Sequence, residues 1–466
     1  MRPAPIAFAC ASALLCFLVP GHAAKPERTY DVQVQRTSYG IPHIRANDWG
    51  SLGYGYGYAF AQDNVCVLAR DALVAQGRQA RHFGAGGGNA TLASDWVYGM
   101  VNSPARVDAA WSRLDDDLRE LLTGYALGYN RYLRDTQPAA LPADCRGQPW
   151  VQPLTGKDVM KVLRKLLVRA GTGNFVGALV AASPPAAATA SLGTSVDSAG
   201  DASAVAAASS AVIDPATLPD FNPERFGSNA VALGSELTGG AGALLGNPHF
   251  PWYGIERFYA VHLTIPGRYD AMGASIYGFP LVNIGFNRYV AWSHTVSTAR
   301  RFVLRELNIV PTAPTTYRVD GQTVAMQPET VTVDVLQANG SVAPAAHTFW
   351  MTQFGPVLVP AAAPQALWTT STAYALTDVN LENTRAFRQY REMGQARSVD
   401  EFASVLRRNV GLPWVNTVAT DAGGSAYYAD IGSMPNVTAA QLAACIRPGF
   451  SQALAASRVY ALDGST

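Results

Sequence analysis

Apolar residues recur at helical spacing through the first third of the chain. The segment 51–83 contains no proline and carries apolar residues near the spacing of one helix face, which predicts a helix. Residues 25–50 are expected to be extended, because 30–34 alternate between apolar and polar and 40–44 indicate a strand and a turn. The rest of 25–180 is expected to be mostly helical. Two stripes with i, i+3 and i+4 spacing predict further helices, at Leu114, Leu118, Leu121, Leu122, Tyr125 and Tyr129 and at Val159, Val162, Leu163, Leu166 and Leu167.

The pattern becomes strand-like after Phe226. Asp320-Gly321 and Asn339-Gly340 lie between alternating runs and predict hairpin turns. Ser398 and Glu401 have the spacing of a capping box, which predicts a helix through Leu406. Helices followed by strands, without repeated βαβ units, predict an α+β fold. Strands are expected at 230–233, 243–245, 258–264, 282–286 and 302–310, and a further hairpin at 416–428.

Between these two parts the composition shifts sharply. Residues 181–218 are dominated by Ala, Ser, Gly, Pro and Thr, so they bury too little apolar surface to order themselves. Composition alone favours an ordinary interdomain linker. We divide the chain into a helical part at 25–180, a spacer at 181–227 and a sheet-rich part at 228–466.

Composition and charge narrow the class of protein. Of the 466 residues 48% are hydrophobic and 15% are charged, which is typical of a folded protein with a large core. Lys and Arg number 35 against 34 Asp and Glu, so the chain has no overall basic field that would attract nucleic acid. We expect no nucleic-acid partner.

The N-terminus has the pattern of an export signal. Arg2 precedes an apolar run at 6–19, which is too short to span a bilayer comfortably. Pro20-Gly21 breaks the run, and Ala23-Ala24 offers small residues for cleavage. We therefore predict a signal peptide at 1–24, a periplasmic protein and no membrane anchor.

Removal of that signal leaves an odd number of cysteines. Of the three that remain, we expect Cys66 to pair with Cys145 in an oxidising compartment. Cys445 would then be a free thiol, an intermolecular link or the partner of a cysteine elsewhere. Neither a CxxC pair nor a histidine cluster indicates zinc, and we expect no metal and no cofactor.

The end of the spacer offers a nucleophile. A cut between Gly227 and Ser228 would give Ser228 a free α-amine beside its own hydroxyl. An amine of this kind has a pKa of about 8 and takes up the hydroxyl proton near neutral pH. The sequence contains no GxSxG, SxxK or HExxH motif, so the rival hydrolase signatures are absent.

The residues around this position resemble a known family. Gly227-Ser228-Asn229-Ala230-Val231 and Gly246-Asn247-Pro248-His249-Phe250 are similar to the start of the β subunit in the penicillin acylase family of N-terminal-nucleophile hydrolases. Within that family the chain looks most like the acyl-homoserine-lactone acylases. The same order of motifs continues at Gly40-Ile41-Pro42-His43-Ile44, at 52–64, at 282–286, at 291–296 and at 380–385.

The resemblance implies a fold and a site. The fold is a four-layer αββα sandwich in an α/β heterodimer cut from one precursor. Ser228 would be the nucleophile, His249 would hold the α-amine, and the backbone N–H of Val296 would donate to the oxyanion. His43, His262 and His294 are expected to be structural or pocket histidines and not catalytic ones. An apolar acyl pocket is expected to involve Phe250, Trp252, Leu281, Val282 and Phe286.

Two departures from the family pattern stand out. Arg300-Arg301 occupies the place where penicillin G acylases carry acidic calcium ligands, so no calcium is expected there. The family's second oxyanion donor, an asparagine followed by an arginine, would lie beyond Cys445 and is not found. We expect 228–466 to be the N-terminal part of a longer β subunit.

The resemblance also implies the reaction. We expect hydrolysis of a small acyl-amide substrate, and the preferred candidate is an N-acyl-homoserine lactone. The alternatives are amidase activity on a penicillin, cephalosporin or lipopeptide side chain, and an inactive exported fragment that lacks part of the oxyanion hole.

Overall fold

A computed structural model describes residues 28–186, 227–359, 367–447 and 459–465. Contacts divide the chain into Met1–Tyr30 and Asp31–Thr466, and every element below belongs to the second unit. The predicted signal peptide and nearly all of the predicted spacer lie outside the described residues, so both assignments stay predictions.

Helices follow where the apolar stripes predicted them. The two long stripes lie in α5 (Asp116–Asp135), apart from Leu114 just before it, and in α6 (Gly156–Leu167). The proline-free segment forms α1 (Trp49–Gln76) and α2 (Ala80–Phe83). Cys66 of α1 forms a disulfide with Cys145, beyond the end of α5. The other helices before the spacer are α3 (Ala90–Val101), α4 (Pro104–Ser112) and α7 (Val176–Val180).

Glycines let α1 and α5 approach closely. A Cβ on Gly57 would stand 1.9 Å from the carbonyl oxygen of Tyr125, and a Cβ on Gly128 would stand 1.9 Å from that of Tyr54. Any larger residue at these positions would force the two backbones apart. The pair packs against the first sheet and forms the larger core with it.

The first sheet joins residues from both sides of the spacer. Its strand order is β1-β2-β5-β6-β7-β8-β16-β17, and the parallel pairing of β2 with β5 places His43 opposite His262. The bounds are β1 (Val32–Arg36), β2 (Pro42–Ala46), β5 (Phe258–Ile265), β6 (Tyr269–Ile276), β7 (Ile284–Phe286), β8 (Val290–Val296), β16 (Val415–Asp421) and β17 (Ala426–Ala429).

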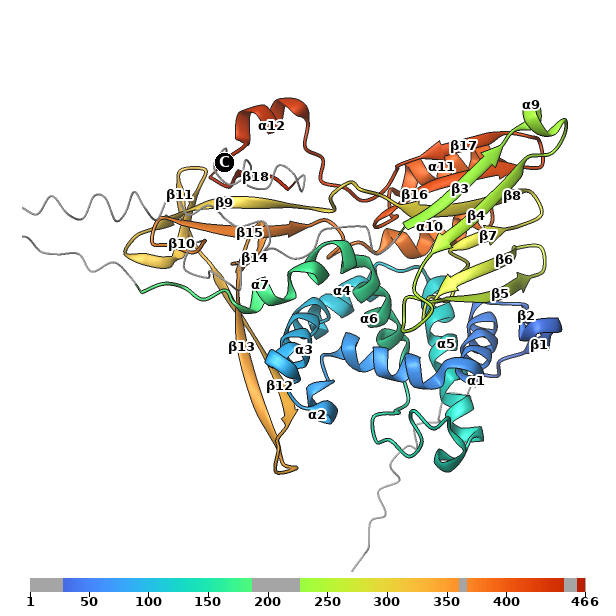
Figure 1. The fold of residues 1–466 in the computed structure, drawn as a ribbon, viewed down its shortest axis with the longest axis horizontal. Helices are drawn as coiled ribbons and strands as arrows, with labels where there is room; N and C mark the ends of the chain where they lie inside the picture. Colours follow the sequence, from blue (N-terminus) through green and yellow to red (C-terminus); the bar gives the residue numbers. More distant parts are fainter. Residues whose placement is uncertain (1–27, 187–226, 360–366, 448–458, 466) are drawn as a thin grey trace, which may run out of the picture. The chain divides into compact units, whose positions relative to one another are not determined.

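The two faces of this sheet are covered differently. Trp292 packs toward Phe402 of α11 (Val399–Asn409), on the same face as α10 (Arg385–Met393). Ser293, its neighbour on β8, points to the other face because side chains alternate along a strand. On that face a ribbon of β3 (Gly227–Leu233) and β4 (Ala243–His249), with α9 (Ser235–Thr238) between them, lies against β8 and β16 (Figure 1).

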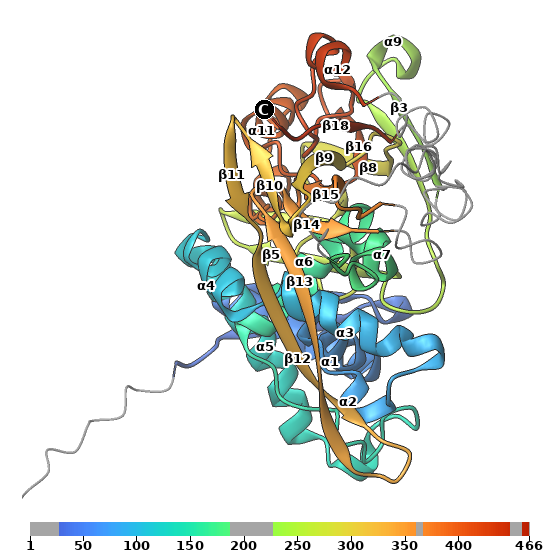
Figure 2. The same cartoon turned by 90° about the vertical axis from the view of Figure 1, so that its left-hand side faces the viewer.

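A second sheet covers other helices. Its order is β11-β10-β9-β15-β14-β13-β12, with β18 parallel to β9, and its core includes residues of α3 and α7. Figure 2 shows β12 and β13 as a long ribbon that runs past α3. The bounds are β9 (Phe302–Val310), β10 (Ala313–Val319), β11 (Gln322–Ala325), β12 (Gln327–Leu336), β13 (Val342–Thr352), β14 (Gly355–Leu358), β15 (Thr372–Asp378) and β18 (Ala461–Asp463), and α12 (Ala439–Cys445) precedes β18.

The predicted hairpin turns are confirmed. Asp320-Gly321 joins β10 to β11, Asn339-Gly340 joins β12 to β13, and β16 pairs with β17 across 422–425. The capping box is confirmed only in part. Ser398 accepts from the Glu401 N–H, but the Glu401 carboxylate accepts from Arg397 N–H rather than from Ser398, and the helix continues to Asn409.

The mixture of helices and antiparallel sheet agrees with the α+β prediction. In the described residues, the face of the first sheet opposite α10 and α11 carries a two-stranded ribbon and not a second full sheet. The four-layer sandwich therefore stays an expectation of the resemblance. None of the helices in the described ranges combines the length and apolarity that a bilayer crossing requires.

Candidate functional site

Ser228 lies at the start of β3, directly after the predicted cut. Its hydroxyl donates to the carbonyl oxygen of Gly227, the residue on the other side of the scissile bond. Ser228 and Ala230 are partly buried and Asn229 is exposed, so the Ser228 side chain shares the face of the ribbon that packs on the first sheet. The Ser228 hydroxyl thus lies against the carbonyl group of the predicted cleavage site.

His249 lies opposite Gly227 at the end of β4. A Cβ on Gly227 would stand 3.5 Å from His249 Nδ1, and the Asn229 amide lies 3.4 Å from Nε2. His249 shares the exposed face of the ribbon with Asn229, whereas the Ser228 hydroxyl is on the other face. His249 therefore lies beside the backbone of Gly227, the residue before Ser228, and not beside the Ser228 hydroxyl.

Val296 is the last residue of β8 and lies opposite Val415 of β16. The next N–H along, that of Ser297, donates to the carbonyl of Trp414. Because alternate residues in an antiparallel pair turn their N–H groups to opposite sides, the Val296 N–H points away from β16. On that side β7 pairs with β8 only as far as Trp292, so the Val296 N–H lies beyond the paired region.

Asn416 lies beside Val296 but its amide is already engaged. Its Nδ2 donates to the Thr295 hydroxyl at 3.0 Å and to the Val296 carbonyl at 3.3 Å. Its Oδ1 accepts from the Tyr428 hydroxyl at 3.3 Å. These bonds fix the end of β8 and leave the amide of Asn416 poorly suited to a second oxyanion donor.

An apolar cavity adjoins Val296. Its volume of about 40 Å³ leaves room for only a few water molecules, so its walls must part to admit an acyl chain. Phe250 was predicted as a wall and does line it. The remaining lining residues are Leu166, Leu167, Phe258, Ile276, Phe279, Asn283, Ile284, His294, Thr295, Val296, Tyr390, Pro413, Trp414 and Val415.

The other predicted wall residues do not line this cavity. Trp252 lies in the loop after β4 with 86% of its surface exposed. Phe286 is half-exposed, and it shares the opposite face of the sheet with Ala291, its partner on β8. Leu281 and Val282 are buried in the core under the sheet. Sequence reasoning missed Phe279, Tyr390 and Trp414 because three separate segments bring them together, and no local motif marks them.

His294 is the buried histidine of the cavity. Its Nδ1 lies 3.0 Å from the carbonyl oxygen of Asn416 and 3.3 Å from the Thr417 hydroxyl. Its Nε2 has no hydrogen-bond partner among the described residues. Burial lowers the pKa of His294 to about 4, so the ring is neutral near pH 7.

His43 and His262 form a pair elsewhere. Their Nδ1 atoms are 2.8 Å apart across the parallel β2–β5 pairing, and His262 Nε2 lies 2.8 Å from Asp270. Neither residue lines the apolar cavity. Whether they have more than a structural role stays a prediction.

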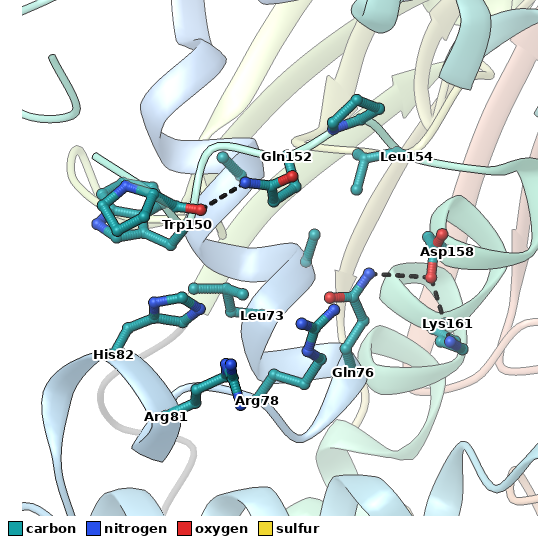
Figure 3. Close-up of a pocket in the computed structure, with 14 residues that line it drawn as sticks. Leu73, Gln76, Arg78, Arg81, His82, Trp150, Gln152, Leu154, Asp158 and Lys161 are labelled. Carbon is teal, nitrogen blue, oxygen red and sulfur yellow. Dashed lines mark hydrogen bonds and ion pairs between the residues drawn. The ribbon is translucent and has the colours of Figure 1, made fainter. Parts of the chain in front are cut away.

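A second cavity, of about 550 Å³ and lined by both polar and apolar residues, lies between α1, α2, α6 and the segment 149–154 (Figure 3). Arg78, Arg81 and His82 line it on one side and Lys161 on another, and Lys161 pairs with Asp158 at 3.1 Å. Burial and the two arginines lower the pKa of His82. This cavity shares no lining residue with the apolar one, so it is separate from the candidate site.

The described ranges contain no group of three or more His, Cys, Asp or Glu residues placed to hold a metal ion. At the place where calcium ligands were considered, Arg301 is buried and pairs with Asp430 at 3.6 Å.

The sequence of this chain belongs to the penicillin amidase family, whose model matches residues 31–463. It is 42% identical over 465 residues to the acyl-homoserine lactone acylase PvdQ of Pseudomonas fluorescens, covering 98% of this chain and 57% of that protein. It is 43% identical over 481 residues to the aculeacin-A acylase of Actinoplanes utahensis, covering all of this chain and 58% of that protein.

The chain thus spans somewhat more than half the length of these relatives. Among solved structures it is similar to a thermostable penicillin G acylase from Alcaligenes faecalis, with 20% identity and a TM-score of 0.39 over 46% of this chain and 36% of that chain. Family membership rests on the sequence match and not on this structural likeness.

Proposed function

We propose that the protein is an amidohydrolase whose nucleophile is Ser228, made N-terminal by self-cleavage. The Ser228 hydroxyl attacks the Gly227 carbonyl, the peptide bond becomes an ester, and water opens the ester to a Gly227 carboxylate and a free Ser228 amine. The observation that supports this most directly is the hydrogen bond from the Ser228 hydroxyl to the Gly227 carbonyl oxygen.

The same hydroxyl then attacks the substrate amide. The α-amine of Ser228 takes the hydroxyl proton, and the Val296 N–H donates to the oxyanion of the tetrahedral intermediate. The intermediate collapses with transfer of the proton to the leaving amine, and water hydrolyses the acyl ester. His249 adjoins the backbone of Gly227, which supports a role in holding the new α-amine.

We propose N-acyl-homoserine lactones, the signals of bacterial quorum sensing, as substrates. The apolar cavity beside Val296 supports an acyl chain as the group on the carbonyl side of the amide. The relatives named acyl-homoserine lactone acylase support homoserine lactone as the amine that leaves when the amide is hydrolysed. The relative named aculeacin-A acylase supports a lipopeptide side chain as the second candidate substrate.

Competing substrates and matched variants test this proposal. Purified protein is incubated with dodecanoyl-homoserine lactone, aculeacin A and penicillin G, and the released amine is measured. We expect the lactone to be hydrolysed with the highest kcat/KM, and Ser228→Ala to abolish both cleavage of the chain and turnover. Ser228→Cys is the matched control, because a thiol is able to make the same acyl shift.

The remaining alternative is an inert protein. If the wild-type chain is cut at Gly227 but releases amine from none of the three substrates, the second oxyanion donor is missing and the fragment interpretation holds. Loss of one such donor lowers kcat by roughly a hundred- to a thousandfold.

Export is part of the proposal. The N-terminal pattern supports a periplasmic location, and the Cys66–Cys145 disulfide is the kind of bond that an oxidising compartment maintains. Sequencing the N-terminus of the exported protein tests it, since a product that begins at Met1 would exclude cleavage after Ala23 or Ala24.

A further inference from the structure

One buried polar atom beside the apolar cavity has no partner among the described residues. His294 lines the cavity, is 5% exposed, and its Nε2 has no hydrogen bond to any described residue. A buried polar atom left without a partner is unfavourable by an amount similar to a lost hydrogen bond. A ligand that entered the cavity with a matching group would remove this penalty.

The hydrogen bonds of the ring decide what that group must be. Nδ1 lies 3.0 Å from the Asn416 carbonyl oxygen, which only accepts, so Nδ1 carries the proton. Since burial lowers the pKa of His294 to about 4, the ring carries a single proton near pH 7. Nε2 is therefore a bare acceptor, and it calls for a donor from the ligand.

The other polar side chains of the cavity do not offer a bare acceptor of this kind. Asn283 Oδ1 accepts from the Ile276 N–H, and Thr295 Oγ1 accepts from the Asn416 amide. Tyr390 stands edge-on to His294 with ring centroids 5.8 Å apart, and burial raises the pKa of its hydroxyl, which stays protonated. His294 thus adds an unsatisfied acceptor to a lining that is mostly apolar.

We propose that His294 is a specificity residue of the acyl cavity and that its Nε2 accepts a hydrogen bond from a hydroxyl group on the acyl chain of the substrate. This inference rests on the proposed function, because it takes the cavity as the acyl site. An unsubstituted chain offers no donor to Nε2. A keto oxygen offers only a lone pair, so it is disfavoured.

The position of His294 along β8 limits where that hydroxyl lies. His294 and Val296 are two residues apart on one strand, which corresponds to about 6.8 Å between their Cα atoms. If the Val296 N–H holds the carbonyl oxygen, Nε2 meets the chain within the first several carbons. Chains hydroxylated at carbon 3 or carbon 5 are therefore the relevant substrates.

The test compares four acyl-homoserine lactones on the purified protein: dodecanoyl, 3-hydroxydodecanoyl, 5-hydroxydodecanoyl and 3-oxododecanoyl. At least one of the two hydroxylated substrates should have a kcat/KM about tenfold above that of the unsubstituted substrate. A gain of this size corresponds to one neutral hydrogen bond. The difference should lie in KM, because the bond is remote from the reacting atoms and forms equally in the ground state and the transition state.

Three variants distinguish the contribution of His294 to this preference from that of its neighbours. His294→Asn keeps an amide at the place of Nδ1 but does not reach the cavity, and it should reduce the preference to about one. His294→Gln reaches further and should retain part of the preference. Tyr390→Phe removes the neighbouring hydroxyl and should leave the preference unchanged.

The inference is overturned if wild-type protein treats hydroxylated and unsubstituted chains alike, or if the preference survives His294→Asn. Failure of the proposed function gives a different result, since no lactone would then be hydrolysed. In that case calorimetric binding of 3-hydroxydodecanoate, 5-hydroxydodecanoate and dodecanoate to wild type and His294→Asn decides the matter without turnover. Equal binding of all three acids would overturn the role of Nε2.

Discussion

The lowered pKa of His294 makes the free energy of unfolding depend on pH. Its pKa is about 4 in the folded state and about 6.5 in the unfolded chain, so between these values only the unfolded chain takes up the proton. The folded state therefore loses stability as the pH falls from 6.5 to 4, by about 3 kcal/mol in total. Above pH 6.5 this contribution does not change.

We predict that His294→Gln, which does not titrate, reduces the loss of stability over this range. The free energy of unfolding from urea titrations at pH 7 and pH 4.5 should fall less in the variant than in the wild type. An equal fall in both proteins would mean that His294 titrates in the folded state as it does in the unfolded chain.

A buried ion pair ties α1 to α6. Lys165 Nζ lies 2.8 Å from the Asp71 carboxylate, and the two side chains are only 11% and 5% exposed. We predict that Lys165→Met lowers the free energy of unfolding by about 3–5 kcal/mol, because it leaves a buried carboxylate without its partner. Urea unfolding of purified protein measures this change.

The double variant Asp71→Leu with Lys165→Met is the matched control. It removes both charges and should recover much of the stability, because an apolar pair of similar volume tolerates burial. A double variant as unstable as the single one would contradict an electrostatic origin of the loss.

At the scale of residues, the sequence identified those positions whose motifs are local. Ser228 follows a glycine at the end of a spacer, and His249 follows a proline in a family motif, so the sequence alone predicts a role for both. A role of Trp252 and Phe286 in an acyl pocket stays a prediction. An aromatic residue near a motif indicates an apolar surface, but the exposure of Trp252 in its loop and of Phe286 on β7 depends on how the strands pack, which the sequence alone does not show.

At the scale of elements, the β3–β4 ribbon depends on small residues for its place on the sheet. A Cβ on Gly242 would stand 1.8 Å from the Thr420 hydroxyl and 2.9 Å from the Asp421 carbonyl oxygen. We predict that Gly242→Ala displaces the ribbon, lowers stability by about 1–3 kcal/mol and slows cleavage at Gly227. A time course of chain cleavage on denaturing gels measures the second effect.

Gly240→Ala is the matched control, because a Cβ at Gly240 meets no atom within 4 Å. It should cleave at the wild-type rate. If the two variants cleave equally fast, contact of the ribbon with β16 does not determine the position of Ser228.

The sequence alone predicts the elements with strong periodicity, but it does not predict the close contacts between them. The stripes in α5 and α6 and the Asn-Gly and Asp-Gly turns depend on neighbours in sequence. The contact of α1 with α5 depends on Gly57 meeting the backbone of Tyr125, and nothing in a single helix indicates which partner its glycines face. The apolar cavity is likewise assembled from α6, α10, five strands and the loops beside them, so its lining required the structure.

At the scale of the whole molecule, the cut proposed at Gly227 would divide a continuous structure. The parallel β2–β5 pairing joins residues before and after the cut, and the larger core contains residues of both parts. Polar contacts also cross between them: the Trp414 indole donates to the Leu166 carbonyl at 3.0 Å, and Tyr259 donates to Asp63 at 2.6 Å. The Cys66–Cys145 disulfide, in contrast, lies entirely before the cut.

We therefore predict that the cleaved protein remains one particle under native conditions. It should elute as a single peak in size-exclusion chromatography with both fragments present, because burial of the shared core opposes their separation. In a denaturing gel it should give two bands with and without reductant, because the disulfide does not link the fragments. Ser228→Ala should give one band under both conditions and the same native elution volume. Two native peaks would show that the β2–β5 pairing and the shared core do not hold the fragments together, and bands that separate only after reduction would place a disulfide across the cut.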